Sequence, residues 1–143
     1  MFMFRGILPL ANYFIIGIDI VRPSTQNIDY RVIHHEIFHI IYLQHKEIFN
    51  DKDWIKFNNP KFEYAECSTC TKNIGLKKYK KTKGFFTEYS KSTASEDMAE
   101  VYSHMIYLEN NEIDQIRELD LILNNKILYI ESKIKQIDSS FTF

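Results

Sequence analysis

The apolar residues follow two spacings along the chain, and each spacing predicts a different secondary structure. Residues 13–21, Tyr-Phe-Ile-Ile-Gly-Ile-Asp-Ile-Val, alternate between two faces and are rich in β-branched side chains, which is typical of a strand. Elsewhere apolar residues recur every three or four positions, which is typical of helices. We expect such helices over residues 28–43, 51–57 and 93–108, and two more within 110–138 that meet near Asn124-Asn125. This pattern predicts an α+β fold, mainly helical, with a small N-terminal β-sheet packed on the helices.

Gly17 lies inside the predicted strand. Another backbone can approach a strand closely at a glycine, and a substrate that lies along an exposed sheet edge requires such an approach. Gly17 is therefore a candidate substrate-binding residue. An ordinary strand with a glycine kink accounts for it as well.

The N-terminal stretch has a superficial likeness to a signal sequence. Arg5 is its single positive charge, Pro9 and Asn12 interrupt the apolar run, and no small-x-small cleavage site precedes Asp19. The run is also too short and too interrupted to span a bilayer. We therefore expect no signal peptide and no membrane-spanning segment, which leaves the cellular compartment open.

Length and composition are those of one globular domain. The chain has 143 residues, of which 45% are hydrophobic, and its four glycines and three prolines argue against linkers or disorder. A formal net charge of -1 gives no reason to expect nucleic acid or an acidic membrane as a partner. We expect a single domain over residues 1–143, whose partner must be inferred from its site.

The motif His35-Glu36-Ile37-Phe38-His39 lies in a predicted helix that is apolar almost all round, so we expect this helix to be buried centrally. Residues four apart share one helix face, so the two imidazoles point to one place and Glu36 lies beside them. This is half of a zinc site with a base next to it. Two imidazoles and a carboxylate would leave a fourth position for water, whose pKa zinc lowers to about 7. Because such a pentapeptide also arises by chance on a core helix, a third ligand has to be found.

The best source of that ligand is the helix predicted over residues 93–108. Thr93 and Glu96 have the spacing of a capping box, so the helix has a clear start. Glu96 and Glu100 share one of its faces, and a tyrosine, Tyr89, lies just upstream. Paired carboxylates on a helix are usually solvated, but this is the one helix, apart from the motif helix, that has a clear start and a tyrosine just upstream.

Cysteine usage adds little chemistry. Cys67 and Cys70 form one C-x-x-C pair without a second, so a closed four-cysteine zinc site is excluded. A redox motif would require a βαβ pattern, which this region lacks. We expect a reduced or loosely paired loop.

Two separated blocks of the chain match a known pattern. Their residues are His34-His35-Glu36-Ile37-Phe38-His39-Ile40-Ile41, Trp54, Asn59-Pro60, Phe62, Tyr64, Phe86-Thr87-Glu88-Tyr89 and Glu96-Asp97-Met98-Ala99-Glu100-Val101. Together they resemble a bacterial family of zinc-binding metallopeptidases, and the second block is also similar to the catalytic domain of anthrax lethal factor. The likeness runs from about Ile16 to Tyr107.

The resemblance implies a zincin-like, gluzincin-type fold and a role for each matching residue. Zinc would be held by His35, His39 and Glu96, with Glu36 as the general base. Glu100 would hydrogen-bond a ligand histidine. Tyr89 would donate to the oxyanion. The family would also suit a secreted or cell-surface protein.

The sequence therefore predicts a zinc-dependent peptidase that hydrolyses peptide bonds with a zinc-activated water, and whose partner is a peptide or protein. The alternative is a truncated or catalytically inactive zinc-binding domain with a structural or partner-recognition role. That alternative arises because less of a sheet precedes the motif helix than in complete zincin domains.

Overall fold

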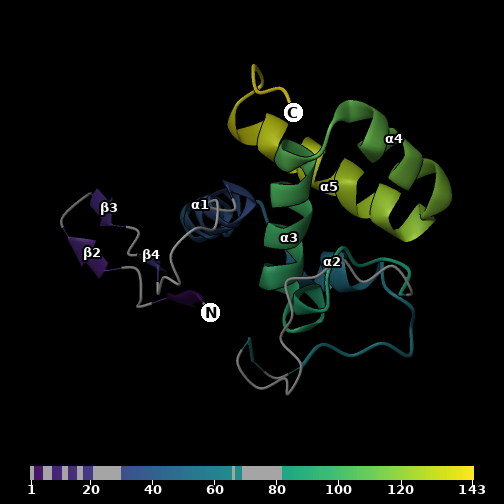
Figure 1. Cartoon of the computed structure of the whole chain (residues 1–143), viewed down its shortest axis with the longest axis horizontal. Coiled ribbons are helices and arrows are strands. Elements are labelled where there is room, and N and C mark those ends of the chain that lie inside the picture. The colour runs from purple at the N-terminus through teal and green to yellow at the C-terminus, as the bar shows by residue number, and fades with distance from the viewer. Residues whose placement is uncertain are drawn as a thin grey trace. The chain divides into compact units, whose positions relative to one another are not determined.

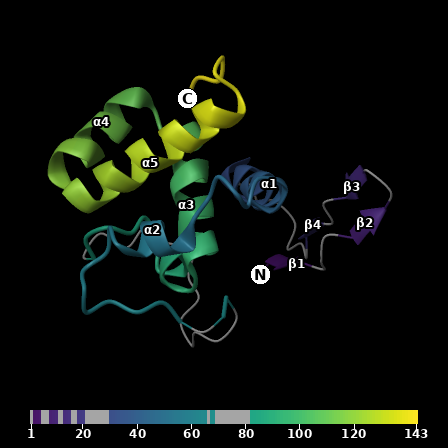
Figure 2. The same ribbon diagram turned by 180° about the vertical axis from the view of Figure 1, so that it is seen from behind.

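The structure is a computed structural model of the chain (Figures 1 and 2). It describes four short strands between Phe2 and Ile20, and residues 30–65, 67–68 and 82–143. The chain divides into two compact units, Met1–Tyr30 and Arg31–Phe143. We describe each unit by itself; whether they act as the predicted single domain stays a prediction.

The first unit contains two separate antiparallel strand pairs. The strands are β1 (Phe2–Phe4), β2 (Leu8–Leu10), β3 (Tyr13–Ile15) and β4 (Ile18–Ile20). β1 pairs with β4, placing Phe2 opposite Ile20, and β2 pairs with β3, placing Leu8 opposite Ile15. The predicted strand over residues 13–21 is therefore wrong as a single element, because β3 and β4 belong to different pairs. Gly17 lies outside the described residues, so its role stays a prediction.

The second unit is helical. Its elements are α1 (Tyr30–Gln44), α2 (Asp51–Ile55), the 3-10 helix η1 (Tyr89–Lys91), α3 (Ala94–Tyr107), α4 (Asn110–Leu119) and α5 (Leu121–Ile137). α3 lies between α1 on one side and the α4–α5 pair on the other, as both views show. α3 contacts α5, α2 and η1, and it is the element around which the others gather.

The predicted α+β fold with an N-terminal sheet packed on the helices is wrong. Over residues 30–65, 67–68 and 82–143 the structure contains helices and loops and no strand. Three-residue strands in isolated pairs are too small to form a layer that buries a helical face. The core is made by the helices instead, since each presents an apolar stripe to its neighbours.

Capping side chains set the helix boundaries. Thr93 caps α3 by accepting a hydrogen bond from the Glu96 backbone N–H at 3.2 Å. Asp120 caps α5 by accepting from the backbone N–H groups of Ile122 and Leu123. The break between the last two helices is therefore at Asp120, and the prediction of a break near Asn124-Asn125 is wrong: a cap with two hydrogen bonds decides the boundary, and asparagines inside a helix do not.

Aromatic and aliphatic side chains from all the helices form the core. Phe38 of α1 is fully buried, with its ring centroid 5.3 Å from that of Tyr102 on α3 and 5.2 Å from that of Phe49. Burying one such side chain contributes about 1.5–3 kcal/mol. The prediction of a centrally buried helix is wrong for α1, because Tyr30 at its start is 65% exposed and Leu43 near its end is 46% exposed. Its buried residues include Phe38 and His35, so α1 presents one face to α3.

A buried ion pair holds the first turn of α3 in place. Asp97 and Lys126 are both fully buried, and the Lys126 Nζ lies 2.6 Å from the Asp97 Oδ2. The same oxygen accepts hydrogen bonds from the Tyr64 hydroxyl at 2.6 Å and the Trp54 indole at 2.9 Å. Lys126 also donates to the Gly84 carbonyl. Removing one partner of such a pair typically costs about 3–5 kcal/mol, because the other charge stays buried. Glu96 precedes Asp97, so this cluster fixes the backbone that carries it.

Candidate metal centre

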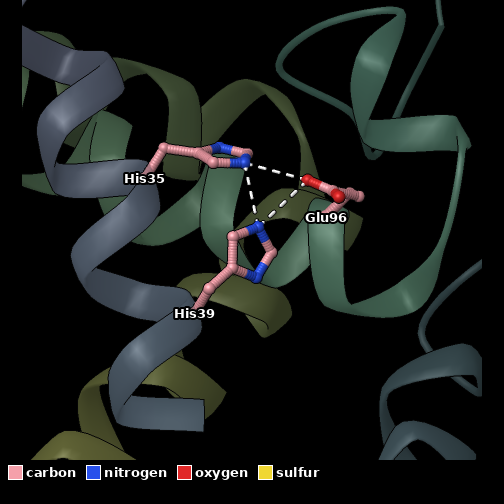
Figure 3. Close-up of side chains that lie close together, drawn as sticks. All are labelled: His35, His39 and Glu96. Carbon is pink, nitrogen blue, oxygen red and sulfur yellow. Dashed lines mark hydrogen bonds and ion pairs between the residues drawn. The ribbon is translucent and has the colours of Figure 1, made fainter. Parts of the chain in front are cut away.

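Two helices bring together one carboxylate and two imidazoles. His35 and His39 lie one turn apart on α1, and Glu96 lies in the first turn of α3 (Figure 3). The His35 Nε2 is 2.9 Å from the Glu96 Oε2, and the His39 Nε2 is 3.1 Å from the same oxygen. The two Nε2 atoms are 3.2 Å apart. Three ligand-type atoms thus form a nearly equilateral triangle.

This triangle fits a zinc ion. With zinc–ligand bonds of about 2.0–2.1 Å, the ligand atoms of a tetrahedral site lie about 3.3 Å apart. The observed edges of 2.9, 3.1 and 3.2 Å are slightly shorter, so small side-chain movements seat an ion against all three atoms. Within the described part of the chain, these residues form the one group of histidine, cysteine and acidic side chains that could hold a metal ion. Two nitrogens and one oxygen are a donor set that zinc accepts.

The centre is closed on one side and open on the other. The His35 side chain is only 6% exposed, whereas those of His39 and Glu96 are 18% and 13% exposed. Glu36 is 14% exposed, and its Oε1 lies 3.9 Å from the His35 Nε2. Burial raises the pKa of Glu36 above its ordinary value, although the two histidines oppose the shift. A carboxylate beside three potential ligands and reachable from solvent is placed as a proton acceptor would be.

Opposite charges tie His35 and Glu96 together. Burial disfavours charge on both groups, but each pairing outweighs that penalty. The Glu100 and Glu96 carboxylates raise the pKa of His35 to about 9. The His35 and His39 imidazoles lower the pKa of Glu96 to about 2. In the metal-free protein, the positive charge of protonated His35 therefore partly neutralises the Glu96 carboxylate.

Glu100 contacts the far side of the His35 ring. Its Oε1 lies 2.8 Å from the His35 Nδ1, within ion-pair distance. The same oxygen accepts a hydrogen bond from the Arg31 Nη1 at 2.8 Å, and the Glu100 Oε2 accepts one from the Thr87 hydroxyl, also at 2.8 Å. Burial raises the pKa of Glu100, but His35, Arg31 and His104 outweigh it and lower the pKa to about 2.

Tyr89 approaches the centre from η1. Its ring centroid is 5.8 Å from that of His35, and its hydroxyl is hydrogen-bonded to the Glu96 side chain and to Ser68. Burial and the Glu96 charge raise the pKa of Tyr89 above its ordinary value, so the hydroxyl keeps its proton. Tyr89 is therefore a neutral hydrogen-bond donor beside the ligand triangle.

The sequence reasoning assigned no site role to Arg31, Thr87 or Ser68. Arg31 precedes His35 by one helical turn, so its place on the same face of α1 could have been inferred from spacing. Thr87 and Ser68 carry no comparable signal, because loops bring them to the centre. Cys67, next to Ser68, is disulfide-bonded, and Cys70 lies outside the described residues. Of the two states expected for this loop, reduced or loosely paired, Cys67 is therefore in the paired one.

The comparison with protein families agrees with this geometry. The model of a family described as "Putative zinc-binding metallo-peptidase" matches residues 15–138. The chain belongs to this family. The match covers β4, all the helices and the three residues of the ligand triangle, so the whole candidate metal centre lies within the matched region.

The two other comparisons add no further relatives of this chain. No curated protein and no solved structure matches the chain. The likeness to the catalytic domain of anthrax lethal factor therefore rests on the residues quoted for it and stays a prediction, as does the zincin fold. None of the described helices of this family member is long and apolar enough to cross a membrane.

Proposed function

We propose that the chain is a zinc-dependent peptidase in which His35, His39 and Glu96 hold the metal ion. The observation that carries the proposal is the triangle of three ligand atoms with Glu36 beside it, in a member of a family described as zinc-binding metallopeptidases. The expected partner is a peptide or protein substrate.

The proposed mechanism uses two groups besides the ligands. When bound, zinc supplies a Lewis acid that polarises the attacking water and the scissile carbonyl. Glu36 takes the proton of that water on its carboxylate and delivers it to the nitrogen of the departing amine. Tyr89 donates its hydroxyl hydrogen bond to the carbonyl oxygen as negative charge develops there, a contribution of about 2.7–4 kcal/mol for one such donor. The raised pKa of Tyr89 supports this role, because a tyrosinate could not donate.

The direct test is cleavage of a mixed peptide library by the purified protein, before and after chelation. We expect one zinc ion per chain, cleavage that stops when the chelator removes zinc, and recovery when zinc is added back. A folded protein without zinc would refute the proposal. One zinc per chain without cleavage, together with a fall in melting temperature on chelation, would instead identify a zinc-binding domain with a structural or partner-recognition role.

Metal binding is expected to weaken steadily as the pH falls below about 9. Because the pKa of His35 in the metal-free protein is raised to about 9, its ring carries a proton below that pH, and a metal ion must displace this proton. With one proton released per ion, the apparent zinc affinity falls about tenfold per pH unit.

Isothermal titration with zinc at several pH values measures this slope. The stability of the metal-free protein should depend on pH in the opposite direction, which gives an independent check. The stability that protonated His35 contributes is fully present below its ordinary pKa of 6.5 and is lost as the pH rises through about 9. A zinc affinity that is independent of pH between 7 and 9 would contradict the assignment of His35.

A further inference from the structure

The Glu100 carboxylate links the metal centre to Arg31 on α1 and to Thr87, which precedes η1. Glu100 is fully buried. Its Oε1 faces both the Arg31 Nη1 and the His35 Nδ1 at 2.8 Å, and its Oε2 accepts from Thr87. A buried carboxylate needs a compensating charge as well as hydrogen bonds. Thr87 supplies a hydrogen bond without charge, so the permanent charge beside Glu100 is that of Arg31.

Arg31 also links α1 to α3 by two contacts. It is 5% exposed and precedes His35 by one turn, so both side chains leave the same face of α1. Its Nη1 lies 2.8 Å from the Glu100 Oε1 and 3.4 Å from the Ser103 hydroxyl. Two contacts on α3 from one planar guanidinium hold its direction more firmly than a flexible ammonium group would.

The His35 ring connects these contacts to the ligand triangle. Of the two ring nitrogens, Nε2 faces His39 and Glu96, and Nδ1 faces Glu100. An acceptor at Nδ1 fixes the orientation of a ligand imidazole, and losing it typically costs 10–100-fold in metal affinity. The Glu100 Oε1 that faces Nδ1 is also the oxygen that accepts the hydrogen bond from Arg31.

We infer that Arg31 is a positioning residue of the metal centre, which acts through Glu100 on His35 and thereby tightens metal binding. The inference rests on the proposed function only in taking His35 as a metal ligand. It does not require that the protein cleave peptides.

The test compares the zinc affinity of Arg31→Met with that of the wild type, by competition against a chromogenic chelator. We expect the affinity to fall about 10–100-fold. Arg117→Met is the matched control, since Arg117 also pairs with a glutamate, Glu131, at 3.1 Å but lies on α4, away from the centre. We expect wild-type affinity in the control. The visible absorption spectrum of the Co²⁺-loaded proteins should change in Arg31→Met alone, which a general loss of stability would not produce.

A double-mutant cycle shows whether Arg31 acts through Glu100. Glu100→Gln should lower zinc affinity, and adding Arg31→Met to it should lower affinity little further. Independent, additive losses would overturn the inference, as would wild-type affinity in a folded Arg31→Met. If Arg31→Met does not fold, Arg31→Lys replaces it: weaker zinc binding than in Arg117→Lys supports the inference and equal binding overturns it. A wild type that binds no zinc would refute the proposed function instead, so the two failures are distinguishable.

Discussion

Replacing Glu36 with glutamine is expected to abolish peptide cleavage while the protein still binds one zinc ion per chain. Glutamine has nearly the same shape but cannot accept a proton at neutral pH, so the water keeps its proton and the rate falls by about 10²–10⁴-fold. Metal content should not change, because Glu36 is not part of the ligand triangle and its Oε1 is 3.9 Å from the nearest ligand nitrogen. Single-turnover cleavage of the best library peptide measures the rate, and mass spectrometry measures the zinc.

The control for Glu36→Gln is the same chemical change at an exposed position. Glu118 on α4 is exposed, and Glu118→Gln should leave both the rate and the zinc content unchanged. If Glu36→Gln keeps the wild-type rate, the general base is a different group and the proposed mechanism is wrong. If it loses zinc as well, Glu36 contributes to the metal site in a way that the geometry does not indicate.

Replacing Glu96 with alanine is expected to remove both zinc and activity. The Glu96 Oε2 is the one oxygen of the triangle and lies 2.9 and 3.1 Å from the two ligand nitrogens. Without it, the two imidazoles fill only half of a tetrahedral site. The loss of zinc affinity should exceed the roughly 10–100-fold loss that is typical when a residue that hydrogen-bonds a metal ligand is removed. Zinc content after dialysis without chelator measures it.

Loss of zinc in Glu96→Ala is informative only if α3 still forms. The cap should survive, because Thr93 accepts its hydrogen bond from the backbone N–H of residue 96 and not from the side chain. Circular dichroism of the metal-free variant checks the helix content, and Glu118→Ala serves as the matched control. Full zinc content in a folded Glu96→Ala would show that another group, with Glu100 the nearest acid on α3, is the third ligand.

Capping and spacing made much of α1 and α3 predictable. The prediction of a helix over residues 28–43 agrees with Tyr30–Gln44, and that over 93–108 agrees with Ala94–Tyr107. The N-terminal sheet was predicted wrongly, because alternation over nine residues does not say whether a strand continues or breaks. The break at Asp120 was missed because its capping role depends on the hydrogen bonds that its carboxylate makes.

Local periodicity by itself determined which groups of this protein share a helix face. His35 and His39 are four residues apart, as are Glu96 and Glu100, and a spacing of four places both side chains of each pair on one face in any α-helix. This is why the two histidines could be named as half of a metal site before the fold was known, whereas Glu96 was named as the third ligand by the family resemblance.

Only the tertiary structure decided which of those groups meet. Glu96 lies 2.9 Å from His35 across 61 residues of chain, and Arg31 pairs with Glu100 across 69. Such contacts depend on how α1 packs against α3, which the Phe38–Tyr102 contact and the buried Asp97–Lys126 pair help to set. Packing between helices is a cooperative outcome of many side chains, so no local spacing encodes it. For that reason the two histidines were visible in the sequence, whereas the arginine behind them became visible only in the fold.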